Sequence, residues 1–378
     1  MAKKEFLRTW VSISRSAAKK NYEFFRKLAG PKTKLWSVVK SNAYGHGLFA
    51  FSKLLNEFGV DGFCVDSITE GLALRREGIL RPILILGPTL ATQLPAAEKA
   101  KIIVSASCME DLRALGLLKE PPEFHIKIDT GMRRRGFYPE DVAKIVGFLK
   151  SKKSLKNKFT GVFTHFASAK DINYPTYTDI QLTRLKKVSK TLRAEGFEFM
   201  EHASATGGAL INKKYHLDAV RVGIGLYGLW PSRELEVQLG QLGKTKLYPV
   251  LSWQGIVTEI KKSKRGDFVG YDLTERLLRD TKIAILPVGY WHGFPRALSS
   301  VGSVLISGKR AKVLGRVSMD LIALDATGIN CKAGDIATLI GKNHGEMLSA
   351  SYLAELSGTT HYEYVTRLNP LMERRIVT

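Results

Sequence analysis

The sequence has few cysteines and no long apolar run. Its three cysteines, Cys64, Cys108 and Cys331, are widely separated, and none stands in a C-x-x-C pair. Their odd number and spacing argue against a disulfide framework or a zinc site. No uncharged apolar stretch is long enough to cross a bilayer, and the N-terminus lacks the apolar core of a signal peptide. We therefore expect a cytoplasmic protein with reduced cysteines.

Acidic residues are scarce relative to basic ones. The 58 lysines and arginines outnumber the 35 aspartates and glutamates, which gives a formal charge of +23. Such a charge is compatible with an anionic partner such as nucleic acid or a membrane surface. However, the basic clusters at 152–158 and 261–265 lack the interleaved aromatics of a single-strand binder. We expect a solvated basic surface and neither of these partners.

Short β-branched runs alternate with amphipathic stretches through the first two thirds of the chain. Helical spacing of apolar residues is found, for example, at 67–77, 109–118, 139–150 and 178–194. Eight strand-and-helix units predict an α/β fold, the (β/α)8 or TIM barrel, with its active site where the strands end. The eight expected strands cover residues 35–40, 62–66, 82–86, 102–105, 124–129, 160–166, 199–204 and 219–222.

From about residue 247 the pattern changes to alternating strands without helices between them. This pattern predicts a separate, mostly antiparallel β domain. We therefore expect a barrel over residues 1–243 and a C-terminal β domain over 244–378, with residues 1–10 able to pack with the second domain.

The most distinctive segment is LWSVVKSNAYGHG at 35–47. Its expected strand ends at Lys40, and an amine buried in an apolar site has a lowered pKa, so it can attack an aldehyde and later act as a base. The alternative is a lysine that extends its ammonium into water. The other strand ends favour chemistry, because Arg134, His165, His202 and Arg221 also fall at the expected rim.

Glycine-rich turns follow the last two expected strands, at 205–208 and 223–225. Barrels commonly bind phosphate there with backbone N–H groups. The GIGLYG run at 223–228 also matches a dinucleotide-binding pattern, but no acidic residue follows at the required distance. A phosphorylated cofactor fits this position better than a dinucleotide.

The chain resembles bacterial alanine racemases from LRTWVSISRSAAKKNYEFFRKL near its start to GTTHYEYVTRLNP near its end, including the segment around Lys40. The resemblance implies pyridoxal 5'-phosphate held by Lys40, and the interconversion of L-alanine and D-alanine for peptidoglycan. It also implies a head-to-tail homodimer, in which the β domain of one subunit completes the other's site and Tyr271 faces the partner's Lys40.

The same resemblance implies the roles of the catalytic residues. Lys40 would act on the D-enantiomer and Tyr271 on the L-enantiomer, with His165 bonded to the tyrosine and held by Arg221. Arg221 would also contact the pyridine nitrogen. Because a guanidinium keeps its protons, it leaves the ring unprotonated, which favours an isomerase over a transaminase.

Further residues match family positions one at a time. Arg134 and the backbone at Met319 would bind the substrate carboxylate, and Lys127 matches a lysine that is often carbamylated. The phosphate would be surrounded by Tyr44, Thr206, Gly223, Ile224 and Tyr362.

Several positions depart from the family pattern, and they leave the substrate preference open. A racemase that prefers serine or accepts a broader set of substrates, a non-catalytic carrier of pyridoxal phosphate, and a decarboxylase of related fold are the alternatives. Arg296 and Arg316, which the family has at the entrance, are retained. The departures are Ala205, Lys170, Trp291-His292 and Thr360-His361.

Overall fold

The chain folds into two compact units. The computed structural model describes residues 7–243 and 245–378. We call the unit made of Ala17–Ser41 and Phe51–Tyr248 the barrel unit. The other, the β unit, contains Asn42–Ala50, Pro249–Thr378 and the N-terminal stretch that ends at Ser16. Residue 244, where the sequence places the domain boundary, lies outside the described residues.

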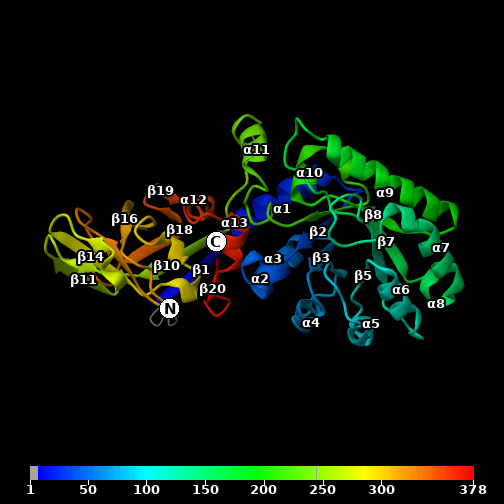
Figure 1. The fold of residues 1–378 in the computed structure, drawn as a ribbon, viewed down its shortest axis with the longest axis horizontal. Coiled ribbons are helices and arrows are strands. Elements are labelled where there is room, and N and C mark those ends of the chain that lie inside the picture. The colour runs from blue at the N-terminus through cyan, green and yellow to red at the C-terminus, as the bar shows by residue number, and fades with distance from the viewer. Residues whose placement is uncertain (1–6, 244) are drawn as a thin grey trace. The chain divides into compact units, whose positions relative to one another are not determined.

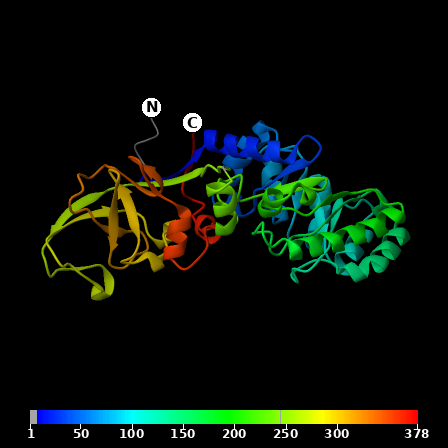
Figure 2. The ribbon, with the colours of Figure 1, turned by 90° about the horizontal axis from the view of Figure 1, so that it is seen from above.

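The barrel unit is built on eight parallel strands that close into a ring (Figures 1 and 2). Their order is β4-β3-β2-β9-β8-β7-β6-β5, and a parallel bridge between Leu84 and Ile103 joins the two ends. The predicted (β/α)8 fold is therefore confirmed. The strands are β2 (Lys34–Val38), β3 (Gly62–Val65), β4 (Ile83–Ile85), β5 (Val104–Ala106), β6 (Phe124–Lys127), β7 (Phe159–Phe163), β8 (Met200–His202) and β9 (Ala219–Val222).

Helices surround these strands in Figure 1. Local sequence explains where several begin: Ser67, for instance, caps α4 by accepting a hydrogen bond from Glu70 N. The α-helices up to residue 235 are α1 (Arg15–Ala29), α2 (Lys40–Tyr44), α3 (Leu48–Phe58), α4 (Ile68–Arg76), α5 (Leu94–Lys99), α6 (Met109–Gly116), α7 (Val142–Ser151), α8 (Lys153–Lys156), α9 (Thr176–Ala194), α10 (Thr206–Ile211) and α11 (Arg233–Leu235). Tighter or wider turns form η1 (Ala91–Gln93), η2 (Pro139–Asp141), η3 (Lys213–Tyr215) and η4 (Glu236–Gln241).

The β unit is built on a mostly antiparallel sheet, as predicted. Its order is β11-β14-β17-β16-β15-β18-β10-β1-β20, with β19 beside β18 and one parallel pair, β1 and β20. The strands are β1 (Thr9–Ser14), β10 (Leu251–Ile256), β11 (Glu259–Ser263), β14 (Thr281–Leu286), β15 (Ser303–Ile306), β16 (Lys309–Leu314), β17 (Ile322–Asp325), β18 (Ile336–Asn343), β19 (Glu346–Leu348) and β20 (Arg374–Val377). A separate hairpin pairs β12 (Phe268–Val269) with β13 (Glu275–Arg276), and the helical segments are η5 (Tyr271–Leu273), η6 (Tyr290–His292), η7 (Arg296–Leu298), α12 (Ala350–Leu356) and α13 (His361–Thr366).

Several barrel strands end earlier than the apolar runs predicted. The expected strand over 35–40 ends at Val38, and the one over 160–166 ends at Phe163. Lys40 therefore begins α2, and His165 lies in the loop after β7 and not within a strand. Both expectations were wrong in the same way, because apolar residues such as Val39 and Phe166 continue past the end of the strand. Lys40 and His165 consequently lie beyond the strand ends, whereas Lys127, His202 and Arg221 lie within strands.

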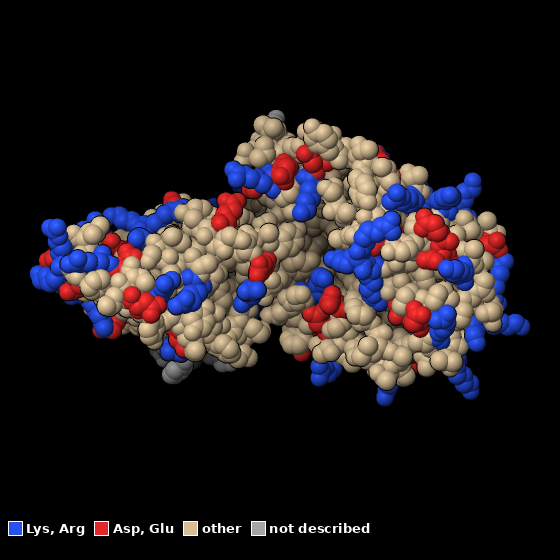
Figure 3. Space-filling view, in the orientation of Figure 1, with Lys and Arg blue, Asp and Glu red and all other residues tan. Residues whose placement is uncertain are grey.

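Lysine and arginine side chains are spread over the surface drawn in Figure 3, and carboxylates lie among them. Among the residues that the structure describes, no helix is both long and apolar enough to cross a membrane.

The close packing of the barrel interior generates a stability prediction. Gly161 on β7 pairs in register with His125 on β6, and a Cβ atom at Gly161 would lie 2.5 to 2.6 Å from the His125 ring. We expect Gly161→Ala to lower the free energy of unfolding by about 1–3 kcal/mol, since the core has no room for the methyl group. Urea denaturation measures this loss.

Gly147 in α7 provides the matched control, because a Cβ atom there would meet nothing within 4 Å. Gly147→Ala should raise stability by up to about 1 kcal/mol through helix propensity. Equal effects of the two substitutions would contradict the packing argument.

Candidate active site

A buried arginine occupies the centre of the barrel unit. Strand β9 carries Arg221 into the interior, where its side chain is 2% exposed. Its Nη2 donates to Thr164 O at 2.7 Å and to Ala203 O at 2.9 Å. Among the described residues no carboxylate pairs with it. Burial lowers the pKa of Arg221 to about 10, so the guanidinium is still charged at neutral pH.

Two histidines extend this network and are fixed in one tautomer. Arg221 Nη1 donates to His202 Nδ1, because a guanidinium cannot accept. The proton of His202 is therefore on Nε2, which donates to His125 Nδ1 at 2.9 Å. Burial and the Arg221 charge lower the pKa of His202 well below its usual value and that of His125 to about 3. Both rings are neutral, and the chain of donors starts at Arg221.

His165 lies beside this network without joining its hydrogen bonds. It is partly buried, and its backbone carbonyl accepts from Gln181 Nε2 at 3.2 Å. Burial, followed by the charges of Arg221 and Arg134, lowers the pKa of His165 to about 3. The described hydrogen bonds of Arg221 go to His202 and two carbonyls, so the link from Arg221 to His165 that the resemblance implies stays a prediction.

Lys40 begins α2 and is not in the buried apolar setting that the sequence predicted. Its side chain is 37% exposed, and its Nζ lies 3.2 Å from Asp66 Oδ1. The carboxylate of Glu70 fixes the backbone on both sides of this pair. It accepts from Ser41 N, next to Lys40, at 2.6 Å and from Asp66 N at 2.8 Å. A partly exposed pair of this kind contributes at most about 1 kcal/mol. The amine can therefore leave Asp66 at low cost.

A left-handed turn follows Lys40. Ser41, Asn42, Ala43 and Tyr44 all have φ between 51° and 56°, although none is glycine. Tyr44 lies in the β unit, 6.2 Å from Tyr362 on α13 between ring centroids. Burial raises the pKa of Tyr362, so its phenol keeps its proton and can donate to an anion.

His46 supports the backbone of this turn. It is fully buried, and its Nδ1 donates to Tyr44 O at 3.0 Å. Burial lowers the pKa of His46 to about 4, so the imidazole is neutral at neutral pH.

Thr206, Gly223 and Ile224 come together in the barrel unit, at the ends of β8 and β9. Thr206 begins α10 and is 2% exposed, and its Oγ1 accepts from Gly223 N at 3.3 Å and Gly225 N at 3.2 Å. A Cβ atom at Gly225 would lie 2.4 Å from the Phe25 ring, so glycine is required there. The result is a tight, buried set of backbone N–H groups around one hydroxyl.

Arg134 and Lys127 add positive charge on β6 and the loop after it. Asp129 shapes that loop by accepting from the backbone N–H of Gly131, Arg133 and Arg134 at 2.7 to 3.0 Å. The Arg134 side chain is exposed, whereas Lys127 is 8% exposed. Burial and the charges of Arg134 and Arg221 lower the pKa of Lys127 to about 8.

The remaining candidates, Tyr271 and Met319, lie on the β unit and are exposed. Tyr271 begins η5 between β12 and β13, and 67% of it is accessible. The next residue, Asp272, has φ of 61° and pairs with Arg316 at 3.6 Å, which fixes this turn. Met319 is 54% exposed, and its carbonyl accepts from Trp291 N at 3.0 Å.

Sequence reasoning missed His125, Asp66 and Glu70. His125 stands two residues before Lys127 on β6, and this alternation was the available signal that both face the barrel interior. Asp66 and Glu70 gave no signal, because carboxylates near helix starts are common.

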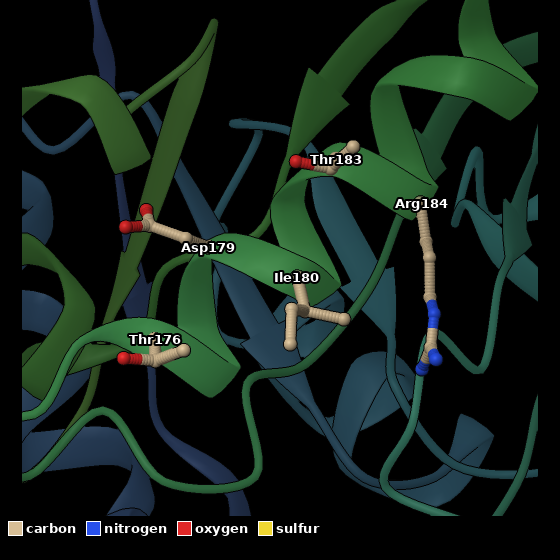
Figure 4. Close-up of a pocket in the computed structure, with 5 residues that line it drawn as sticks. All are labelled: Thr176, Asp179, Ile180, Thr183 and Arg184. Atoms are coloured by element: carbon tan, nitrogen blue, oxygen red, sulfur yellow. The ribbon is translucent and has the colours of Figure 1, made fainter.

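A hollow lies on α9 (Figure 4), and its lining carries no catalytic arrangement. Arg184 donates to Thr130 O at 2.8 Å, and Asp179 binds Lys214 and the Tyr215 hydroxyl. Its charged groups are thus used in structural bonds. The other lining residues are Thr176, Ile180 and Thr183.

Comparison with known proteins identifies the family. Residues 13–231 match the alanine racemase N-terminal domain, and residues 250–376 match the alanine racemase C-terminal domain. The chain belongs to the alanine racemase family. Alanine racemases are isomerases of a pyridoxal phosphate-dependent family, and the barrel with its antiparallel β unit is the fold of their solved structures.

The similarity extends over whole chains. The alanine racemase of Leptospira interrogans is 34% identical over 99% of this chain and 97% of its own length. That of Halothermothrix orenii is 37% identical over 97% of this chain and 96% of its own. The crystal structure of the Bacillus anthracis alanine racemase with bound L-Ala-P superposes with a TM-score of 0.91, at 32% identity, over 99% of this chain and 96% of that one.

The buried His46 of this family member predicts a pH dependence of stability. Its pKa is about 4 when folded against 6.5 when unfolded, so below pH 6.5 the unfolded state binds the proton preferentially. Stability is therefore lost as the pH falls from 6.5 toward 4. In His46→Gln, the loss of unfolding free energy between pH 7 and pH 5 should be smaller by about 2 kcal/mol.

Chemical denaturation at both pH values measures this difference. His344→Gln, at an exposed position, is the control and should leave the pH dependence unchanged. An unchanged slope in His46→Gln would show that His46 does not titrate as argued.

Proposed function

We propose that this protein is an alanine racemase that interconverts L-alanine and D-alanine with pyridoxal phosphate, using two bases. The supporting observation is Lys40 at the rim of a barrel whose interior holds the uncompensated cation Arg221, in a chain similar to alanine racemases along its length. By the same resemblance we propose that it works in the cytoplasm and supplies D-alanine for peptidoglycan.

The residues present fit the cofactor. Arg221 can contact the pyridine nitrogen of the cofactor without protonating it, and the Lys40 amine can bond to the aldehyde carbon of the cofactor. We assign the phosphate to Thr206, Gly223 and Ile224. When bound, pyridoxal phosphate acidifies the α proton of the amino acid by withdrawing electrons.

Racemisation needs a base on each face of the α carbon. Lys40 can remove or return the proton on one face once its amine has left Asp66. For the other face we propose Tyr271 of the partner subunit in a homodimer. The 67% exposure of Tyr271 in the single chain supports this assignment, since a tyrosine that serves a neighbour's site must be accessible.

A tyrosine has an unperturbed pKa of about 10 and needs help to act as a base at neutral pH. The barrel unit can provide that help, because the charges of Arg221 in its interior and of Arg134 on the loop after β6 would favour the charged tyrosinate. His165 is neutral at this pH and can donate its one ring N–H to the phenolate oxygen without adding charge. Arg134 and the backbone at Met319 would then hold the substrate carboxylate.

The two-base mechanism predicts separable effects on the two enantiomers. With pyridoxal phosphate and L-alanine in heavy water, the protein should exchange the α proton and lose optical rotation together. Tyr271→Phe should slow exchange from L-alanine by about 10²–10⁴-fold, while Lys40 continues to exchange the proton of D-alanine. NMR and polarimetry follow both processes, and L-serine tests substrate breadth.

Tyr352→Phe, on α12 of the β unit, is the control and should behave as the unaltered protein. Exchange with retained rotation would rule out the second base. A protein that binds the cofactor but exchanges no α proton would be a carrier, and the racemase proposal would be wrong.

Lys127 should be carbamylated in air. Because its pKa is about 8, roughly a tenth of the amine is neutral at pH 7 and able to add carbon dioxide, and Arg134 nearby would bind the new carboxylate. Intact mass under native conditions should show one added carbon dioxide that disappears when the gas is excluded. Lys127→Arg should show no addition, and an unmodified mass of the original protein under both conditions would refute the modification.

A further inference from the structure

The left-handed turn at Ser41–Tyr44 needs support from outside itself. Non-glycine residues in this conformation cost roughly 1–2 kcal/mol each, so such a turn persists only where its surroundings impose it. Its internal hydrogen bonds include His46 N to Ala43 O and Gly47 N to Asn42 O, both at 2.9 Å, and His46 Nδ1 to Tyr44 O at 3.0 Å. Bonds of this kind join the turn only to itself, so contacts with another segment are needed to hold it in place.

Arg374 at the start of β20 provides much of that support. Its Nε and Nη2 both donate to Gly45 O, at 3.2 and 3.1 Å. The rest of the guanidinium is bound to the chain after α13: Nη1 donates to Asn369 O and Met372 O at 2.6 Å, and Nη2 to Leu368 O at 3.2 Å. All of these partners are backbone carbonyls within the β unit.

The turn and α13 are also in direct contact at Gly45. A Cβ atom at Gly45 would lie 1.8 Å from Val365 O, so the two backbones touch where Arg374 bridges them. Gly45 directly follows Tyr44, and Val365 follows Tyr362 on the same helix. The planar fork of one guanidinium therefore fixes the backbones that carry both tyrosines.

We propose that Arg374 is a positioning residue, which acts through Gly45 O to hold the turn that places the Tyr44 hydroxyl on the phosphate of the cofactor. This inference rests on the proposed function and on the resemblance to alanine racemases, which implies that Tyr44 and Tyr362 surround that phosphate. Arg374 touches neither substrate nor cofactor in this scheme.

Comparison of phosphorylated and unphosphorylated cofactor tests the role directly. Arg374→Met should raise the Kd of pyridoxal phosphate by about 10–100-fold, the value of one hydrogen bond to a charged group. The Kd of pyridoxal, which has no phosphate, should change by less than about 2-fold, since Tyr44 would act only through the phosphate. The Kd of pyridoxal phosphate for Arg374→Lys, which has one compact donor group, should lie between those of the unaltered protein and Arg374→Met. Fluorescence titration of the purified protein gives both constants.

Arg75 supplies the matched control. Its guanidinium also binds only carbonyls, those of Ile79, Arg81, Ala100 and Lys101, in the turns that precede β4 and β5 at the opposite end of the barrel. Arg75→Met should change the two Kd values equally or not at all. In addition, Tyr44→Phe combined with Arg374→Met should bind pyridoxal phosphate within about 2-fold of Tyr44→Phe alone, because both act through one contact.

Hydrogen exchange provides a readout that does not depend on the cofactor. In Arg374→Met, but not in Arg75→Met, the amides of His46 and Gly47 should exchange faster without ligand. Equal weakening of both cofactor forms, additive losses in the double variant, or unchanged exchange at His46 and Gly47 would each overturn the role of Arg374. If the unaltered protein bound neither cofactor form, the proposed function would fail. Faster hydrogen exchange at His46 and Gly47 in Arg374→Met would still show that Arg374 holds the turn.

Discussion

The site depends on one buried guanidinium that no carboxylate neutralises among the described residues. Arg221 is satisfied by two backbone carbonyls and by His202, which leaves its full charge inside the barrel. That charge sets the protonation of its surroundings: it adds to burial in keeping His125, His202 and His165 neutral and in lowering the pKa of Lys127. The neutral rings of His202 and His125 therefore have fixed donor and acceptor atoms, and they add no further charge.

A site with this electrostatic character favours anions. The rim carries Arg134 and Lys40 in addition to the interior cation, and within the described part of the chain the counter-ion of Lys40 is the exposed Asp66. A phosphate and an amino acid carboxylate would therefore be drawn to it, and a phenolate would be stabilised beside it. The formal charge of +23 on the whole chain acts in the same direction, at longer range and subject to screening by salt.

The sequence was sufficient for the barrel, because short and largely apolar segments, many of them β-branched, recur eight times with helical patterns between them. It placed strand ends too late at Lys40 and His165, since apolar composition does not show where ladder hydrogen bonds stop. It also gave no sign of the left-handed turn, which is imposed by Arg374 some 330 positions away in the chain. Contacts of this kind come from the fold as a whole, so local propensity cannot reveal them.

Backbone groups bind most of the important charges in this protein. Arg221 and Arg374 bind carbonyls, whereas Asp129 and Glu70 bind N–H groups of the loops that they shape. A backbone partner is fixed by the fold, so these charges hold their positions but cannot easily exchange partners. Lys40 differs, because it is paired with a side chain in a partly exposed position. Lys40, whose partner is weakly bound and replaceable, is thus the residue from which the proposed mechanism requires both bond formation and proton transfer.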